Sequence, residues 1–309
     1  MTSAPLARER TPDRPGPGPL PEAFLRALDL QIGRRIDGLL AGEHRTAAMG
    51  IGTELAQIRE WEPGDDVRRI DWNATARSNN VQVRVDVAER AVTSWVVLDV
   101  SPSMRFGTAD RRKWDVAEGV AVATGHIASR RGNRIGIVTF GGADSVMLRP
   151  RQGRVGLLAV LLAVRREPET ERVGATSIGA ALAQVGRVAR QRSLVAVVSD
   201  FRGPRDWRSP LLQLASRHAV VAVEITDPRE QELPNVGHLW LVDPETGRKL
   251  HVDTARRKLR ERFAAAAAEE RAGLARELAS LGVPHLVLST AGEWLRSYAG
   301  FVARERRRR

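Results

Sequence analysis

Residues 94–107 read "SWVVLDVSPSMRFG" and join a short apolar run to three oxygen-bearing side chains. The run ends at Asp99, and Ser101 and Ser103 follow at alternate positions. A short apolar run bounded by turn residues is typical of a strand that is buried on both faces. One carboxylate and two hydroxyls therefore gather at the end of a buried strand. Three uses compete for them: a nucleophile, a phosphate-binding loop or a metal site.

The segments that follow alternate between valine-rich strands and helices. Strands are predicted at 134–140, 194–200, 219–226 and 285–290, and helices at 112–130, 153–164, 177–190 and 255–281. Residues 153–164 are apolar along their whole length and predict a buried helix, whereas residues 238–254 predict a hairpin. This alternation predicts an α/β fold, with a mostly parallel sheet and helices on both faces.

The N-terminal third of the chain has a different character. Residues 1–21 contain six prolines and predict a disordered tail, and residues 22–42 predict an amphipathic helix. Residues 43–93 end in the alternating pattern "VQVRVDVAER" and predict a small β-rich subdomain. We assign residues 94–303 to the α/β domain and residues 304–309, "RERRRR", to a basic tail.

Two further segments place oxygen ligands near the ends of strands. Thr176 precedes the helix at 177–190, and Asp200 ends the strand at 194–200. In a parallel α/β sheet, ligands collect at the carboxyl ends of the strands. Two carboxylates and three hydroxyls, without thiolate or imidazole, suit a hard dication such as Mg²⁺, and Mn²⁺ also fits. We therefore predict a metal site formed by Asp99, Ser101, Ser103, Thr176 and Asp200.

The stretch "DVSPS", with Thr176 and Asp200 following in this order, resembles the metal-ion-dependent adhesion site of von Willebrand factor A domains. The resemblance implies a von Willebrand factor A-like (Rossmann-like) fold. It also implies that the serines and the threonine coordinate the ion directly or through water, and that the aspartates act partly through water. The sixth coordination position is then left for an Asp or Glu of a partner protein.

Two other stretches resemble a narrower bacterial family, domain of unknown function 58. They are "REWEPGDDVRRIDWNATAR" at 59–77 and "DPREQELPNVG" at 227–237, and the likeness covers about residues 40–255. The first of these stretches is called the hallmark below. The resemblance implies that the partner is a MoxR-type AAA+ ATPase or its client, and that the chain has a chaperone-like role in assembling or activating other proteins.

The hallmark also has a physical interpretation. Gly64 after Pro63 permits a tight turn, which brings neighbouring aspartates close to arginines. Arginine binds carboxylates through two parallel hydrogen bonds, so we predict an ion-pair clamp between the β-rich subdomain and the α/β domain. A partner surface, a catalytic role and a second metal site at Asp65, Asp66 and Asp71 are the alternatives. Trp61 and Trp72 are expected to pack at the junction. The residues of the clamp or partner surface are Gly64, Asp65, Asp66, Arg68, Arg69, Asp71, Trp72 and Arg77.

The common hydrolytic sites are not evident in the sequence. A phosphatase of the haloacid dehalogenase type needs an aspartate two residues after the first one, and Ser101 stands there. A serine hydrolase elbow and a Walker-type glycine loop are absent from the sequence, and the six histidines are scattered singly. We therefore favour a non-enzymatic protein-binding module, with a metal-dependent hydrolase at the same cluster as the alternative.

Composition limits the setting and the partners. The net charge is +12, but only three of the 49 basic residues are lysine, which indicates a general preference for arginine rather than a nucleic-acid site. The chain has no cysteine, which fits a reducing compartment. Its longest apolar run, 155–164, is half of the roughly 20 residues that span a membrane. We expect a cytoplasmic protein with no integral membrane segment and no nucleic-acid partner.

Overall fold

A computed structural model of the chain describes residues 17–18, 49–87, 92–130, 133–142, 145–165, 177–243 and 246–305. The chain forms two compact units, residues 36–91 and residues 1–35 with 92–309. The predicted helix at 22–42 lies outside the described residues. So do the two predicted tails, apart from residues 17–18 and 304–305.

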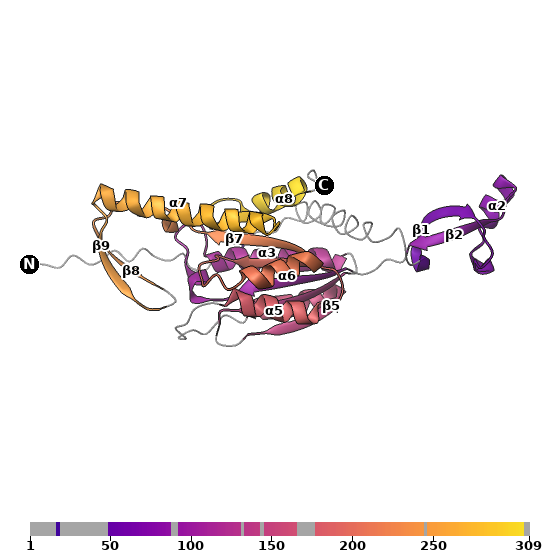
Figure 1. Cartoon of the computed structure of the whole chain (residues 1–309), viewed down its shortest axis with the longest axis horizontal. Helices are drawn as coiled ribbons and strands as arrows, with labels where there is room; N and C mark the ends of the chain where they lie inside the picture. Colours follow the sequence, from indigo (N-terminus) through magenta and orange to yellow (C-terminus); the bar gives the residue numbers. More distant parts are fainter. Residues whose placement is uncertain are drawn as a thin grey trace, which may run out of the picture. The chain divides into compact units, whose positions relative to one another are not determined.

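The larger unit is built on a six-stranded sheet in the order β10-β7-β6-β3-β4-β5 (Figure 1). Neighbouring strands run parallel, except that β5 is antiparallel to β4. The predicted α/β class is therefore confirmed. The edge strand β5 was not predicted, because it is only half-buried and contains Pro150. The strands are β3 (Thr93–Asp99), β4 (Arg134–Phe140), β5 (Met147–Gln152), β6 (Ser193–Ser199), β7 (Ala219–Thr226) and β10 (His285–Ser289).

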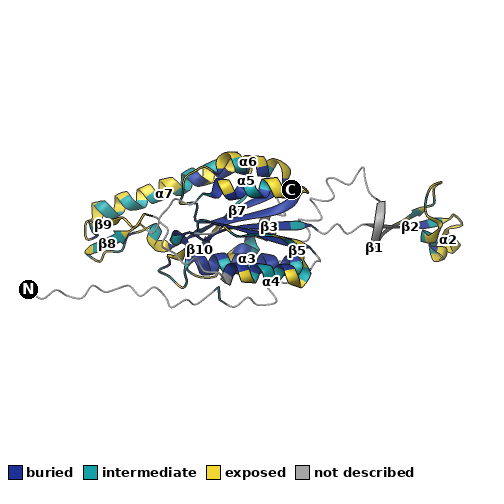
Figure 2. Ribbon diagram, turned by 90° about the horizontal axis from the view of Figure 1, so that it is seen from below, coloured by how far each residue is buried: buried dark blue, intermediate teal, exposed yellow. Residues whose placement is uncertain are grey.

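Helices cover both faces of this sheet (Figure 2). One face carries α3 (Lys113–Arg130) and α4 (Gly153–Arg165), and α8 (Trp294–Glu305) packs beside α3. The other face carries α5 (Ile178–Val188) and α6 (Arg208–Arg217). The long helix α7 (Arg257–Ser280) contributes Leu274 and Leu278 to the core on the side of α5 and α6.

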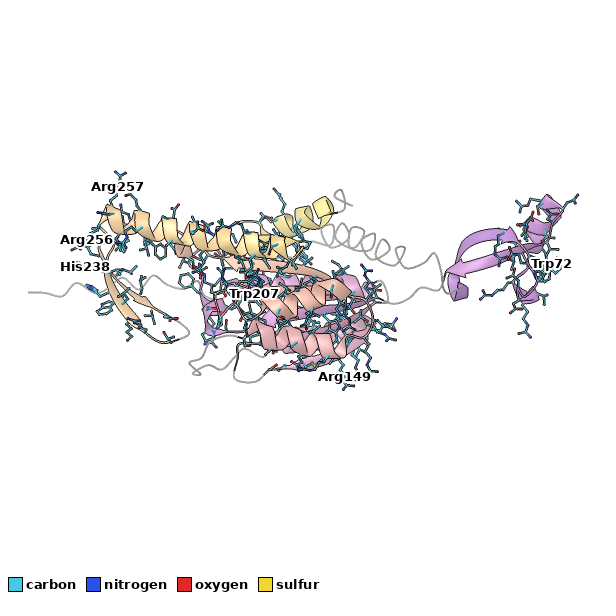
Figure 3. All side chains as sticks on the ribbon, in the orientation of Figure 1. Trp72, Arg149, Trp207, His238, Arg256 and Arg257 are labelled. Carbon is cyan, nitrogen blue, oxygen red and sulfur yellow. The ribbon has the colours of Figure 1, made fainter. Side chains whose placement is uncertain are left out.

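The central strand shows why the sheet needs both layers. Side chains alternate along a strand, so Trp95 and Val97 of β3 pack in one core cluster with Leu182 and Trp207. Val96 and Leu98 point to the opposite face and are also completely buried. Trp207, labelled in Figure 3, lies just before α6 and is fully buried. A continuous apolar strand is therefore stable only because helices cover it on two sides.

The prediction that residues 153–164 form a buried helix is wrong for one face of α4. Val155, Leu158 and Leu162 are 62%, 48% and 64% exposed. These positions are three and four residues apart, so they form a single stripe along the helix. Val160, Ala163 and Val164 are buried on the opposite side. The helix is apolar all round, but only the side toward the sheet and α3 is covered.

The smaller unit pairs β1 (Met49–Glu60) with β2 (Gln82–Val87) in antiparallel fashion. Between them lie a short 3-10 helix, η1 (Val67–Arg69), and the helix α2 (Trp72–Ser78), which the sequence did not predict. Trp72 at the start of α2, labelled in Figure 3, is 69% exposed, so it packs only in part within its own unit.

The predicted hairpin is present as β8 (His238–Val242) paired with β9 (Lys249–Asp253). Two further 3-10 helices, η2 (Pro102–Arg105) and η3 (Pro228–Glu230), follow β3 and β7 and form part of the site described next.

Within the described residues, no helix has both the length and the apolar character required to cross a membrane.

Candidate metal centre

Four of the five predicted metal ligands lie together at one edge of the sheet. Asp99 ends β3 and Asp200 follows β6, and these two strands are parallel neighbours. Ser101 precedes η2 and Ser103 lies within it. All four residues are buried, with Ser103 the most exposed at 8%. The fifth predicted ligand, Thr176, lies outside the described residues, immediately before Ser177 at the start of α5.

Hydrogen bonds hold these oxygens in place. The Asp99 Oδ1 atom accepts a hydrogen bond from the backbone N–H of Ser101 at 2.9 Å, and its Oδ2 atom accepts one from the Ser199 hydroxyl at 2.5 Å. The Ser101 and Ser103 hydroxyl oxygens lie 3.0 Å apart. Ser103 also forms a hydrogen bond with Asp200. The four residues therefore form one connected cluster of oxygen ligands.

Gly141 closes the cluster from the side of β4. Its φ of +83° belongs to the left-handed region, and a Cβ atom there would lie 2.8 Å from the Ser101 Cβ and 3.1 Å from the Asp99 Oδ1. The turn after β4 can therefore approach the cluster this closely only with glycine. The sequence did not predict this contact with the site.

A lysine that the sequence analysis did not select lies inside the site. Lys113, the first residue of α3, is fully buried, and its Nζ atom lies 2.6 Å from the Asp200 Oδ2 and 2.7 Å from the Glu230 Oε1. The other Asp200 oxygen, Oδ1, accepts a hydrogen bond from the backbone N–H of Arg202 at 3.0 Å. Lys113 therefore balances the charge of Asp200 and bridges it to Glu230.

The pKa values of Asp99 and Asp200 are shifted in opposite directions. Burial, and then repulsion by Asp200, raise the pKa of Asp99 from 3.8 to about 7. Burial also disfavours the ionised form of Asp200, but the attraction and the hydrogen bond of Lys113 outweigh it and lower the pKa of Asp200. Among the described residues no basic side chain forms an ion pair with Asp99. The cluster therefore carries a buried acid that lacks a cation.

The second family stretch, residues 227–237, contains the residues that hold Glu230 against Lys113. Asp227 is fully buried and accepts hydrogen bonds from the Thr108 N–H and hydroxyl at 2.8 and 2.6 Å, and from the Thr290 hydroxyl at 2.6 Å. It also forms a capping box with Glu230 in η3. Burial opposes the ionised form of Asp227, but these hydrogen bonds outweigh it and lower its pKa. Asp227 thus fixes the helix that presents Glu230 to Lys113.

The start of α5 is held in a similar way. The Ser177 hydroxyl donates to the Asp206 Oδ2 atom at 2.7 Å, and the Gly179 N–H donates to the Asp206 Oδ1 atom at 3.2 Å. Asp206, which the sequence analysis did not select, therefore fixes the chain directly after Thr176.

The carboxylates of the hallmark form ion pairs and hydrogen bonds with residues of the smaller unit. Arg59 binds both oxygens of Asp65 at 2.7 Å, and this partner was not among the predicted clamp residues. Asp66 accepts from the Arg68 N–H at the start of η1, and Asp71 caps α2 and forms an ion pair with Arg84 at 2.9 Å. Gly64 has the expected left-handed conformation, with φ +110°.

These contacts bear on the second metal site considered from the sequence. The described residues contain no group of three or more His, Cys, Asp or Glu side chains placed to hold a metal ion. The oxygens of Asp65, Asp66 and Asp71 are instead engaged by arginines and helix N–H groups. That alternative is therefore not supported. The remaining clamp residues, Arg69 and Arg77, stay a prediction.

The comparisons with known proteins identify the family. The family model described as "Protein of unknown function DUF58" matches residues 57–273. The chain belongs to the DUF58 family. It is 39% identical over 287 residues to the uncharacterized protein Rv1480 of Mycobacterium tuberculosis, covering 92% of this chain and 90% of the relative. It is 37% identical over 159 residues to the uncharacterized protein MAV169 of Mycobacterium avium, covering 51% of this chain and 92% of the relative.

Solved structures show more distant likenesses to this DUF58 protein. A conserved hypothetical protein BatB from Bacteroides thetaiotaomicron matches with 12% identity and a TM-score of 0.45, over 70% of this chain and 100% of that one. The SpRpn10 VWA domain matches with 14% identity and a TM-score of 0.36, over 68% of this chain and 94% of that one.

The raised pKa of Asp99 predicts how one substitution changes stability. Between the unfolded pKa of 3.8 and the folded value of about 7, the unfolded chain releases a proton that the folded protein keeps. Asp99 therefore destabilises the fold increasingly as the pH rises, and fully above about pH 7. In metal-free buffer, we expect Asp99→Asn to be more stable than the wild type by roughly 2–4 kcal/mol at about pH 8, and by much less at about pH 4.

Urea unfolding in the presence of EDTA across this pH range measures the difference. The hydrogen bond from the Ser101 N–H is kept in the variant, because the asparagine oxygen can accept it. If the difference in unfolding free energy between the variant and the wild type does not change with pH, burial does not raise the pKa of the Asp99 carboxyl.

Lys113 gives a second prediction. Lys113→Met leaves the buried Asp200 and the partly buried Glu230 without their shared cation, so we expect a loss of about 3–5 kcal/mol of unfolding free energy. Lys258→Met, on the exposed surface of α7, is the matched control and should change stability by less than about 0.5 kcal/mol. Urea unfolding measures both variants. If Lys113→Met and Lys258→Met lower the unfolding free energy by the same small amount, the Lys113 bridge contributes nothing to stability.

Proposed function

We propose that this DUF58 protein is a non-enzymatic protein-binding module, and that Mg²⁺ bound by Asp99, Ser101, Ser103, Thr176 and Asp200 mediates the contact. The observation that supports this most directly is the state of Asp99. It is a buried carboxylate whose pKa rises to about 7 because burial and Asp200 disfavour its charge. A dication beside it would reverse this effect, since an adjacent positive charge favours the ionised acid.

The ligand set fits a hard dication. Carboxylate and hydroxyl oxygens are the ligands that Mg²⁺ binds, and Mn²⁺ accepts the same set. Lys113 carries one positive charge and contacts both Asp200 and Glu230. Set against the three carboxylates of Asp99, Asp200 and Glu230, it leaves two negative charges when all are ionised, which balance a dication. When bound, Mg²⁺ supplies a Lewis-acidic centre that accepts a carboxylate oxygen from another protein.

The residues that flank these ligands favour an acidic partner. Arg105 and Phe106, which follow Ser103, are exposed, and so is Arg202, which follows Asp200 and lies 3.9 Å from the Glu230 carboxylate. Exposed arginines next to a buried cation site attract an Asp or Glu side chain and guide it toward the ion. The surroundings of the site therefore support recognition of an acidic side chain on the partner.

Family membership suggests which partner this is. We infer that the acidic side chain belongs to a MoxR-type AAA+ ATPase or to the client that the ATPase remodels, and that the chain acts in the cytoplasm in chaperone-like assembly or activation. A hydrolase at the same cluster has less support. His218 forms a hydrogen bond with the backbone of Ser193 and His285 forms one with Glu224, so these two rings are engaged away from Ser101 and Ser103.

Metal binding is the first test of this function. Isothermal titration of the metal-free protein with Mg²⁺ should show one saturable site, and Asp200→Ala should abolish it. Asp243→Asn, in the turn of the β8–β9 hairpin, is the control and should bind as the wild type does. Wild-type protein that binds no Mg²⁺ at any pH above about 7, where Asp99 is ionised, would contradict the proposal.

Partner binding is the second test. Immobilised protein should retain the purified MoxR-type ATPase in Mg²⁺ and lose it in EDTA or with Asp99→Ala, because the bridging ion is then absent. Retention that survives both changes would rule out a metal-bridged contact. Turnover of phosphoester or peptide substrates in Mg²⁺, lost in Asp200→Ala, would instead favour the hydrolase.

A further inference from the structure

The β8–β9 hairpin has a free strand edge. Among the described strands, β8 pairs with β9 alone. The Thr254 N–H donates to the Gly237 carbonyl at 2.7 Å, and the Asp243 N–H donates to the Arg248 carbonyl at 2.9 Å. In an antiparallel pair, residues bonded in this way alternate with residues whose backbone groups point away from the partner strand. The residues of β8 that point outward are His238, Trp240 and Val242.

This edge lacks the protection that edge strands usually carry. Natural edge strands commonly contain charged residues or proline, which prevent another strand from pairing with them. The edge strand β5 of the larger sheet follows this rule with Pro150 between Arg149 and Arg151, of which Arg149 is labelled in Figure 3. By contrast, β8 reads HLWLV and has no proline, Asp, Glu, Lys or Arg, and its register with β9 is regular. Such an edge is suited to receive another strand.

The hairpin also exposes apolar side chains that a third strand would cover. Trp240 and Val242 are each 54% exposed, and Leu250 of β9 is 56% exposed. His251 lies beside Trp240, with ring centroids 4.7 Å apart, and His238 stacks on His251 with centroids 5.0 Å apart. These three rings form an exposed row on one face of the hairpin. A two-stranded hairpin is only marginally stable in water by itself, and side chains of an added strand would pack against this row.

The base of the hairpin holds β8 ready for pairing. Thr254 is completely buried, and its hydroxyl donates to the Gly237 carbonyl at 2.7 Å and accepts from the Val236 N–H at 3.1 Å. Arg260, in the first turn of α7, donates to the Thr254 carbonyl at 2.6 Å. A strand that is already extended loses less conformational freedom on binding. The hairpin follows η3 beyond the carboxyl end of β7, so it lies at the same edge of the sheet as the metal centre (Figure 1).

The charges around the hairpin favour an acidic strand. Residues 248–260 contain six basic residues and one acidic residue. Arg248 and Lys249 are exposed, and neither forms an ion pair within the described part of the chain. Arg256 and Arg257, labelled in Figure 3, lie at the start of α7 next to the hairpin. Two copies of this hairpin would bring like charges together, so the complementary strand is that of a different, acidic chain.

We propose that β8 binds an extended acidic segment of a partner protein, which pairs with its outer edge as a third strand. The outward backbone groups of β8 form the hydrogen bonds, alternate apolar side chains of the segment pack against Trp240, and its acidic residues lie near Arg248 and Lys249. This contact does not require the ion, so it succeeds or fails separately from the metal centre. Its position lets one partner use both contacts.

Titration of the full chain with defined peptides tests the edge. The acetylated and amidated peptide EVTVTVE should give saturable shifts of the backbone amide signals of β8, and should slow hydrogen exchange at Trp240 and Val242. The charge-reversed peptide KVTVTVK should bind at least about tenfold more weakly. The peptide EVTPTVE, in which proline removes a central donor, should also bind at least about tenfold more weakly. Absence of saturable binding by EVTVTVE overturns the proposal, and so does equal binding of either control peptide.

Substitutions in β8 locate the contact. Val242→Pro removes an outward N–H but no bond to β9, and should weaken binding of EVTVTVE at least about tenfold. Val242→Thr is the matched control, because it keeps the N–H and a β-branched side chain, and should change affinity less than about threefold. Slow exchange of the Leu241 amide, which points toward β9, checks that the hairpin still forms.

Trp240→Asp gives a second variant that keeps every backbone donor. It places a negative charge on the edge and should weaken binding of the acidic peptide at least about tenfold. If Trp240→Asp and Val242→Pro both bind EVTVTVE as the wild type does, the peptide does not pair with β8 and the proposal is wrong. A dimer of the wild type that Val242→Pro dissociates would assign the edge to a second copy instead, and would also overturn it.

Discussion

Two carboxylates buried at the ends of adjacent parallel strands are the constraint on which the rest of this structure depends. The strands β3 and β6 need apolar cover on both faces, and their parallel pairing places Asp99 and Asp200 at the same edge. Among the described residues, a basic side chain forms an ion pair with only one of them, because Lys113 lies against Asp200. Burial disfavours the charge of Asp99, and the proposed dication would relieve this cost. In that proposal, the stability of the fold and metal binding are coupled through Asp99.

The polar residues around this pair form a support that reaches well beyond the proposed ligands. Lys113 bridges Asp200 to Glu230, and Asp227 fixes Glu230 through a capping box. Asp227 also accepts hydrogen bonds from the hydroxyls of Thr108 and Thr290, and so joins three loops at the same edge of the sheet. The family stretch at 227–237 therefore supports the pair of carboxylates through Glu230 and Lys113. The position of Asp200 depends on this support as much as on its own strand.

The features that follow from local sequence periodicity could be predicted from the sequence. The features that depend on contacts between residues far apart in the chain could not. Valine-rich strands gave the parallel sheet, and the strand ends gave Asp99, Ser101, Ser103 and Asp200 as neighbours. Edge strand β5 and the exposed stripe of α4 were missed, because their burial depends on how far neighbouring elements extend. Lys113 and Glu230 are 117 residues apart, and no local pattern predicts that contact. One signal was available: a chain that otherwise uses arginine has lysine at only three positions, and Lys113 is one of them.

This use of lysine has a physical reason. A guanidinium is planar and has five donors in a fixed arrangement, whereas an ammonium is compact and directs three hydrogen bonds freely. Asp200 and Glu230 approach the same nitrogen atom, at 2.6 and 2.7 Å, and the Lys113 side chain that carries it is completely buried. An arginine there would bring five donors to the two carboxylate contacts and leave three unused, whereas lysine leaves one, and the guanidinium is also a larger group. Arg187 and Arg217, at the carboxyl-terminal ends of α5 and α6, have the opposite situation, since both are exposed and their unused donors can bind water. The choice between lysine and arginine thus separates a cation buried within the fold from cations at its surface.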